Sequence, residues 1–200
     1  GTWAIAMTVG GSTKGLDAGR DSLANVDAFG RPVPTARFMA GREFDMLVPK
    51  AVEPSIGDVE RVIAGDIQAL PSFVQGVGPF PDAEGRWTSD PEGLSNGERT
   101  AAVSLYLALI AQTCLGLCGL GKSVIIEGPL ARNTLFGQAL AALTSVPISA
   151  SADATGTSLG ASLLFGPEEA EVQQAPVIAP LEVAGFADYA RLWTERVSAR

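Results

Sequence analysis

The stretch that decides the fold lies in the second half of the chain and reads Lys122-Ser-Val-Ile-Ile-Glu-Gly128-Pro-Leu-Ala-Arg-Asn133-Thr-Leu-Phe-Gly-Gln-Ala-Leu-Ala-Ala-Leu143. Three β-branched residues in a row, 124–126, are typical of a strand that is buried on both faces. Gly128 and Pro129 end the strand, and Asn133 can cap the helix that follows. A strand leading into a helix N-terminus presents free N–H groups and a positive dipole end, which favour an anionic ligand such as a nucleotide. Every α/β protein contains units of this shape, so a plain structural unit stays open as the alternative.

The composition describes a globular chain with an ample apolar interior. Of its 200 residues, 46% are hydrophobic and 18% are charged, and the formal net charge is −8. A negative charge argues against a nucleic-acid backbone or an anionic membrane surface as partner. No uninterrupted apolar run reaches the roughly 20 residues of a membrane span. The longest, 101–120, contains Ser104 and Gln112 and is expected to be a buried helix. We therefore expect neither a nucleic-acid nor a membrane partner.

Histidine is absent from the chain. Its absence excludes imidazole metal ligands and the histidine base of serine- and cysteine-type catalytic sites, so we expect no metal site built from this chain. Cys114 and Cys118 lie four residues apart among leucines and are expected to be small, reduced core residues. Reduced cysteines are consistent with a cytoplasmic protein.

The order of predicted elements indicates the fold class. Three strand-like segments come first without a helix between them, which predicts an antiparallel meander over 2–9, 22–29 and 33–39. Helical periods and a loop rich in Gly, Pro and acidic residues follow, with helices expected over 40–48, 55–67 and 98–117 and the loop over 76–97. Strands and helices then alternate over 123–127, 133–144, 147–151 and 157–165. This order predicts an α/β domain that matches the ribonuclease-H-like fold of the actin-like ATPases.

Three segments, taken in order, resemble the carboxyl-terminal domain of the FGGY carbohydrate kinases. The opening Gly1-Thr2-Trp3 is similar to the family's Ser-Gly-Thr phosphate turn, and 128–133 is similar to its adenosine turn. The segment 155–164 resembles the start of a further helix, which could close the nucleotide site or merely allow close packing. The resemblance covers roughly residues 1–165 and implies an enzyme that transfers the γ-phosphate of ATP to a sugar hydroxyl. Trp3 after Gly-Thr looks more like the rhamnulose and fuculose kinase branch than the glycerol or xylulose kinase branches.

The resemblance implies which residues bind the cofactors ATP and Mg²⁺. Glycine lets the backbone approach the phosphates, and a threonine can donate to a phosphate oxygen. The expected nucleotide-binding residues are Gly1, Thr2, Gly128, Pro129, Ala131 and Asn133. Asn133 can equally be a plain helix cap. Where the family has three glycines the chain keeps only Gly128, because Pro129 and Leu130 occupy the other two places.

The resemblance also implies a division into parts. Residues 1–166 form the ATPase-like domain, and 167–200 form a polar connection and an amphipathic helix expected over 184–197. The chain begins with Gly1 inside a motif rather than with methionine, so we expect a larger protein. In this family the sugar site and the aspartate general base lie mainly in an amino-terminal domain. We therefore expect that missing domain and a sugar as partners. We expect the isolated chain to be inactive, and a homodimer is a further expected oligomeric state.

Two rival functions remain open on the sequence. The first is a non-catalytic actin-like domain that binds a nucleotide or a partner protein. The lost glycines favour it, and so does the loop 71–79, which has Val77 and Gly78 where the family has a Glu-Arg pair. The second is an oligomerisation module that docks through the helix 184–197.

Overall fold

A three-stranded antiparallel sheet opens the chain. The structure, a computed structural model, describes residues 2–151, 160–162, 164–166 and 175–199. The strands are β1 (Ala4–Met7), β2 (Ser22–Val26) and β3 (Pro32–Phe38), and the sheet order is β1-β3-β2. The three antiparallel strands are confirmed, but the order differs from that of a meander, in which the second strand would be central. β3 takes the centre because four of its residues in a row are buried, whereas β2 is exposed after its first residue.

Helices and short strands follow in the predicted alternation. The two strands of the second half, β6 and β7, pair in parallel, as the α/β pattern predicts. One small ribbon, β4 with β5, was not predicted because each of its strands has only two residues. In chain order the elements are α1 (Ala40–Leu47), α2 (Ile56–Ala64), β4 (Ala69–Leu70), β5 (Arg86–Trp87), α3 (Asn96–Cys118), β6 (Val124–Ile126), α4 (Thr134–Leu143), β7 (Ile148–Ala150) and α6 (Phe186–Ser198), with 3₁₀ turns η1 (Ala18–Arg20), η2 (Pro91–Gly93) and η3 (Gly128–Arg132).

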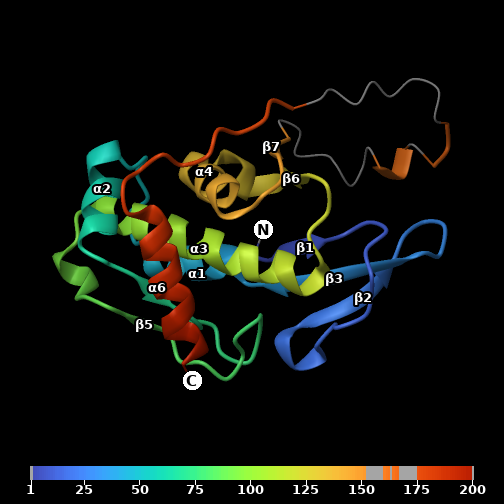
Figure 1. The fold of residues 1–200 in the computed structure, drawn as a ribbon, viewed down its shortest axis with the longest axis horizontal. Helices are drawn as coiled ribbons and strands as arrows, with labels where there is room; N and C mark the ends of the chain where they lie inside the picture. Colours follow the sequence, from blue (N-terminus) through green and yellow to red (C-terminus); the bar gives the residue numbers. More distant parts are fainter. Residues whose placement is uncertain (1, 152–159, 163, 167–174, 200) are drawn as a thin grey trace.

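The helix α3 is the centre of the fold. It runs across the molecule between the first sheet and α4 (Figure 1), and residues 100–110 are buried without interruption. By length and composition α3 is apolar enough to cross a membrane, contrary to the expectation that no segment qualifies. In this fold it is the core helix, since most of its apolar surface lies against β1, β3, α1, α2 and α4.

Capping boxes fix where α2 and α3 begin. Ser55 caps α2 as predicted, with its hydroxyl accepting from the Asp58 N–H. Ser95 caps α3 in the same way with Glu98, so α3 begins two residues before the predicted start. Arg61 of α2 donates to the Glu98 carboxylate at 2.7 Å, which joins the two helices and helps to lower the pKa of Glu98 to about 2.

β6 departs from its prediction in one respect. Its composition predicts burial on both faces, and Ile126 is indeed 7% exposed. Ile125, however, is 62% exposed, because successive side chains of a strand point to opposite faces and the face of Ile125 is left open in the described part of the chain. Within these residues β6 pairs on one edge alone, with β7. The first sheet and the β6–β7 pair are therefore separate sheets here.

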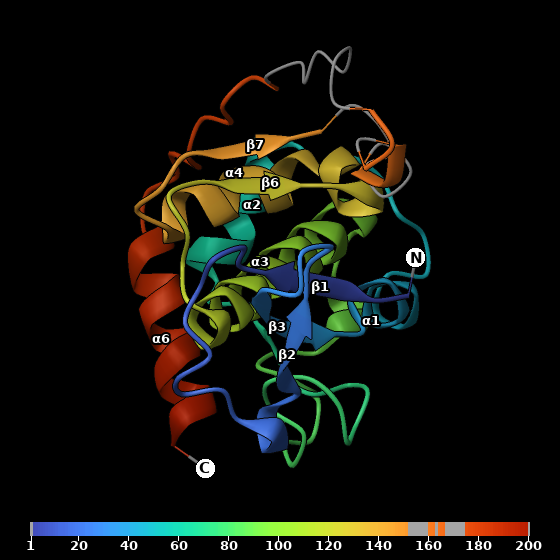
Figure 2. The same cartoon turned by 90° about the vertical axis from the view of Figure 1, so that its right-hand side faces the viewer.

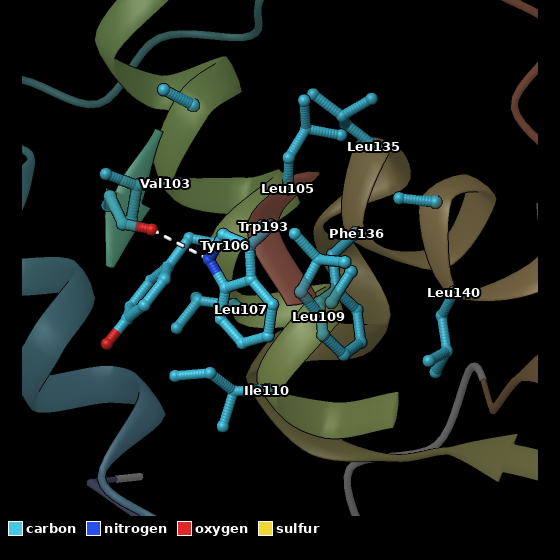
Figure 3. Close-up of a cluster of buried hydrophobic side chains, with 14 of the residues drawn as sticks. Val103, Leu105, Tyr106, Leu107, Leu109, Ile110, Leu135, Phe136, Leu140 and Trp193 are labelled. Atoms are coloured by element: carbon cyan, nitrogen blue, oxygen red, sulfur yellow. Dashed lines mark hydrogen bonds between the residues drawn. The ribbon is translucent and has the colours of Figure 1, made fainter. Parts of the chain in front are cut away.

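The helix α6 packs back on the domain (Figure 1). It begins two residues later than predicted and carries the predicted apolar face, of which Phe186, Tyr189 and Trp193 are buried. The Trp193 ring lies in the same cluster of buried side chains as Tyr106 and Leu107 (Figure 3). Its Nε1–H donates to the carbonyl oxygen of Ala69 in β4 at 2.9 Å.

A buried carboxyl joins α1 to the loop that follows β4. Glu43 is 4% exposed and accepts hydrogen bonds from the Tyr106 hydroxyl at 2.7 Å and from the backbone N–H groups of Phe73 and Val74 at 3.2 Å each. Burial raises the pKa of Glu43, although these hydrogen bonds oppose the rise. Folding therefore favours the protonated, neutral form of Glu43 over its carboxylate.

The raised pKa of Glu43 predicts a pH-dependent difference between the wild type and Glu43→Gln. Glutamine keeps the shape but cannot ionise. The contribution of Glu43 to the free energy of unfolding is fully present below the unfolded pKa, near the ordinary 4.5. It is lost as the pH rises through the folded pKa. Urea unfolding of both proteins at a series of pH values measures the difference in free energy of unfolding. A difference that grows with pH would contradict the burial of an ionisable Glu43.

Candidate nucleotide site

A cavity of about 1210 Å³ lies between β1 and β6. Residues 3–11 line one side and residues 120–127 line the other. Its floor is formed by apolar side chains of α3 and α4, among them Cys114, Leu115, Phe136 and Leu140. β1 and β6 run in opposite senses along it, so the start of β1 and the end of β6 lie at the same end of the cavity (Figure 2).

At that end the first residues of β1 meet the beginning of α1. The Gly41 N–H donates to the Thr2 carbonyl at 3.1 Å, which fixes the chain before β1 against the first turn of α1. Trp3, Gly41 and Asp45 line the cavity here. Thr2 itself is exposed beside them, and the guanidinium of Arg37 lies 4.7 Å from the centre of the Trp3 ring. The helix N-terminus brings a positive dipole end to this side.

The other side of the same end is formed by η3 and the beginning of α4. Gly128 has φ +73° and open space where a Cβ would lie, so its backbone can be approached closely. Pro129 and Asn133 line the cavity. Asn133 caps α4, since its Oδ1 accepts from the Phe136 N–H and its Nδ2 donates to the Ser104 hydroxyl, both at 2.9 Å. A second helix N-terminus thus faces this end.

The charged side chains that line the cavity at this end are acidic. Asp45 and Glu127 both line the cavity there, and both are exposed. An unscreened triphosphate would be repelled by these carboxylates, whereas a nucleotide carrying a divalent cation would be repelled less. Within the residues that the structure describes, no group of three or more Cys, Asp and Glu could hold a metal ion.

The thiols are chemically inert. Cys114 and Cys118 are buried and form no disulfide, as the sequence predicts. Burial raises the pKa of Cys114 to about 12 and also raises that of Cys118. Neither thiol is therefore a nucleophile at neutral pH.

The structure distributes the predicted site residues over both sides of this end. Pro129 and Asn133 line the cavity, while Thr2 and Gly128 each adjoin a lining residue. Ala131 packs against the hydrophobic core, as does Leu130. Gly1 lies outside the described residues, and so do 155–159 and 163 of the predicted third segment. The sequence analysis missed Glu127, Asp45 and the N-terminus of α1. Glu127 could have been found because it directly precedes Gly128.

Comparison with known proteins identifies a family. The chain matches the family described as "Carbohydrate kinase FGGY, C-terminal domain" over residues 1–174. Among curated proteins, no sequence matches.

Several solved structures are similar over nearly the whole chain. A carbohydrate kinase from Novosphingobium aromaticivorans is 34% identical over 100% of this chain, with a TM-score of 0.86. A xylulose kinase from Rhodospirillum rubrum is 15% identical over 100% of it, with a TM-score of 0.67. A Plasmodium falciparum glycerol kinase with ADP is 12% identical over 89%, with a TM-score of 0.62. The last two support the fold alone. The chain spans 45%, 46% and 42% of these three proteins.

Proposed function

Because this chain belongs to the FGGY carbohydrate kinases, whose C-terminal domain it matches, we propose that it is the nucleotide-binding half of an ATP-dependent sugar kinase. The observation that carries the proposal is the meeting of β1, α1, β6 and α4 at one end of one cavity. Thr2 and Gly128 lie on opposite sides of that end, and two helix N-termini face it. In open α/β sheets ligands bind beyond the carboxyl ends of strands, and β6 presents its carboxyl end here.

The phosphates would lie between Thr2 and Gly128. Phosphoryl transfer depends mainly on positioning and on stabilising charge, which backbone N–H groups and a hydroxyl can provide. Thr2 presents an exposed side chain there, and Gly128 leaves its backbone open. Mg²⁺ typically binds substrate phosphates together with one or two carboxylates. Asp45 and Glu127 are carboxylates that line the cavity at that end, and the ion would offset their negative charge.

The base and ribose would lie over η3. Pro129 offers a flat apolar face to the cavity, although it lacks an N–H group to donate. Ala131 and Leu130 support this face from below because both pack against the core. Asn133 acts through the helix cap, since both polar atoms of its side chain already have protein partners.

The sugar and the general base would come from the rest of the protein. The chain spans less than half the length of the related kinases, and relatives with this fold are named for several different substrates. We propose the rhamnulose and fuculose kinase branch on the strength of Trp3, whose ring stacks under Arg37.

The test is phosphoryl transfer by the full-length protein and by this chain alone. Each is incubated with MgATP and a panel of ketoses and polyols, and sugar phosphates are detected by mass spectrometry. We expect transfer to at least one sugar by the full-length protein and none by the chain alone. Phosphoryl transfer by the chain alone would contradict the proposal that the sugar site and the general base lie in the rest of the protein. A full-length protein that binds ATP and phosphorylates no sugar would instead support a non-catalytic actin-like domain, which the two lost glycines favour.

A further inference from the structure

We propose that Ser104, a buried residue of α3, is a positioning residue for the nucleotide. By holding the side chain of Asn133, it fixes where α4 begins at the nucleotide end of the cavity. This inference rests on the proposed function, since it requires that the nucleotide binds at that end. It assigns a role in binding to a residue that lies in the core and does not itself line the cavity.

Ser104 is a polar residue in an apolar place. It is 0% exposed and lies within residues 101–110, all of which are buried. Its hydroxyl oxygen accepts a hydrogen bond from Asn133 Nδ2 at 2.9 Å. A buried hydroxyl costs free energy unless it is paired, and a small apolar residue would fill the same space without that requirement. The serine therefore contributes a directional contact to α4, which the burial of apolar surface does not provide.

Apolar side chains surround this hydrogen bond. Figure 3 shows them in one cluster, to which α3 contributes Leu105 and Leu109, and α4 contributes Leu135, Phe136 and Leu140. Burial of apolar surface is non-directional, so it holds α4 against α3 but defines the position of α4 along its axis less sharply. A hydrogen bond defines that position more sharply because it weakens steeply when its geometry is distorted.

A second hydrogen bond joins the two helices at the other end of α4. Gln112 Nε2 of α3 donates to the carbonyl oxygen of Leu143, the last residue of α4, at 2.8 Å. Ser104 and Gln112 are about two helical turns apart, so α3 holds α4 at both ends. Of these two contacts, that of Ser104 lies at the nucleotide end, because its partner Asn133 lines the cavity and neither Gln112 nor Leu143 does.

The position of Asn133 affects the nucleotide because η3 ends there and α4 begins there. Asn133 Oδ1 accepts from the Phe136 N–H at 2.9 Å, and the Asn133 N–H donates to the Leu130 carbonyl at 3.1 Å. Gly128 and Pro129, which would contact the nucleotide, belong to the same η3. A displacement of Asn133 would therefore move these groups as well, and small displacements of positioned groups weaken binding.

Titration calorimetry of the full-length protein with MgATP tests the proposal on Ser104→Ala and on a matched control, Gln112→Leu. Each variant loses one hydrogen bond between α3 and α4, and alanine and leucine are both good helix formers, so both variants should fold. Ser104→Ala should raise the dissociation constant of MgATP at least about fivefold, which corresponds to one typical hydrogen bond. Gln112→Leu should change it less than about twofold, although it too should be less stable in urea.

A double-mutant cycle shows whether Ser104 acts through Asn133. Asn133→Ser keeps a side-chain oxygen that can cap α4, but the side chain is shorter and loses the contact with Ser104. In that background the addition of Ser104→Ala should change the dissociation constant of MgATP less than about twofold, since the contact is already absent. A role of Ser104 in core stability alone would not produce this dependence on Asn133.

Three outcomes would overturn the proposal. The first is a Ser104→Ala variant that binds MgATP as tightly as the wild type. The second is equal weakening by Ser104→Ala and Gln112→Leu, which would indicate a general loosening of α4. The third is the same weakening by Ser104→Ala with and without Asn133→Ser. In each case a wild type that binds MgATP leaves the proposed function standing, whereas a full-length wild type that does not bind MgATP would overturn both proposals.

Discussion

Trp193→Ala should remove about 3–5 kcal/mol of the free energy of unfolding, the range for losing a large aromatic side chain from a core. Trp193 is 2% exposed, and its ring lies edge-on against Phe80 with the centroids 5.9 Å apart. The substitution also leaves the Ala69 carbonyl without its indole donor. Domains of this size have a total free energy of unfolding of about 5–15 kcal/mol, so the variant should lose a large part of its stability. Urea denaturation measures the loss.

Arg191→Ala on the exposed side of α6 is the matched control. Its side chain is 56% exposed and pairs with Asp188 and Glu195 of the same helix, so the loss should stay below about 1 kcal/mol. If Trp193→Ala costs no more than the control but changes the mass in solution, α6 docks on another copy and the oligomerisation reading is correct. We expect the mass to stay unchanged.

The behaviour of α6 illustrates what the sequence could predict. Its helical period and apolar face are local features, so the helix and its buried residues were predictable. Its binding place was not, because Ala69 lies 124 residues away from Trp193. Similarly, three antiparallel strands were predictable from their composition. The central place of β3 depends on the 14 or so residues between β1 and β2, which can carry the chain past a neighbouring strand.

The candidate site was predictable only in part for the same reason. Gly128 and Asn133 stand out because a strand end and a helix cap have local signatures. The Asn133 side-chain amide donates to the Ser104 hydroxyl because α4 packs on α3, and no local sequence pattern encodes this packing. The acidic lining by Asp45 likewise results from the position of α1 beside β1. Long-range contacts therefore decide which of the local candidates are available to a ligand.

Gly128→Leu should weaken MgATP binding at least about tenfold, equivalent to roughly 1.4 kcal/mol, because its side chain would fill the open space over the backbone. Gly119→Leu is a matched control at the opposite end of the cavity. Both glycines have positive φ, +73° and +82°, with nothing within 4 Å of the Cβ position. Each substitution therefore strains the backbone, and at Gly119, whose ψ of 123° lies outside the left-handed helical region, the cost should be at least about 1–2 kcal/mol.

Calorimetric titration of the 200-residue chain and these two variants with MgATP tests most directly whether the nucleotide binds where β1 begins and β6 ends. We predict measurable binding by the wild type, nearly unchanged binding by Gly119→Leu, and binding at least about tenfold weaker by Gly128→Leu. Equal weakening in both variants, or a wild type that takes up no MgATP at millimolar concentration, would contradict a nucleotide site at that end.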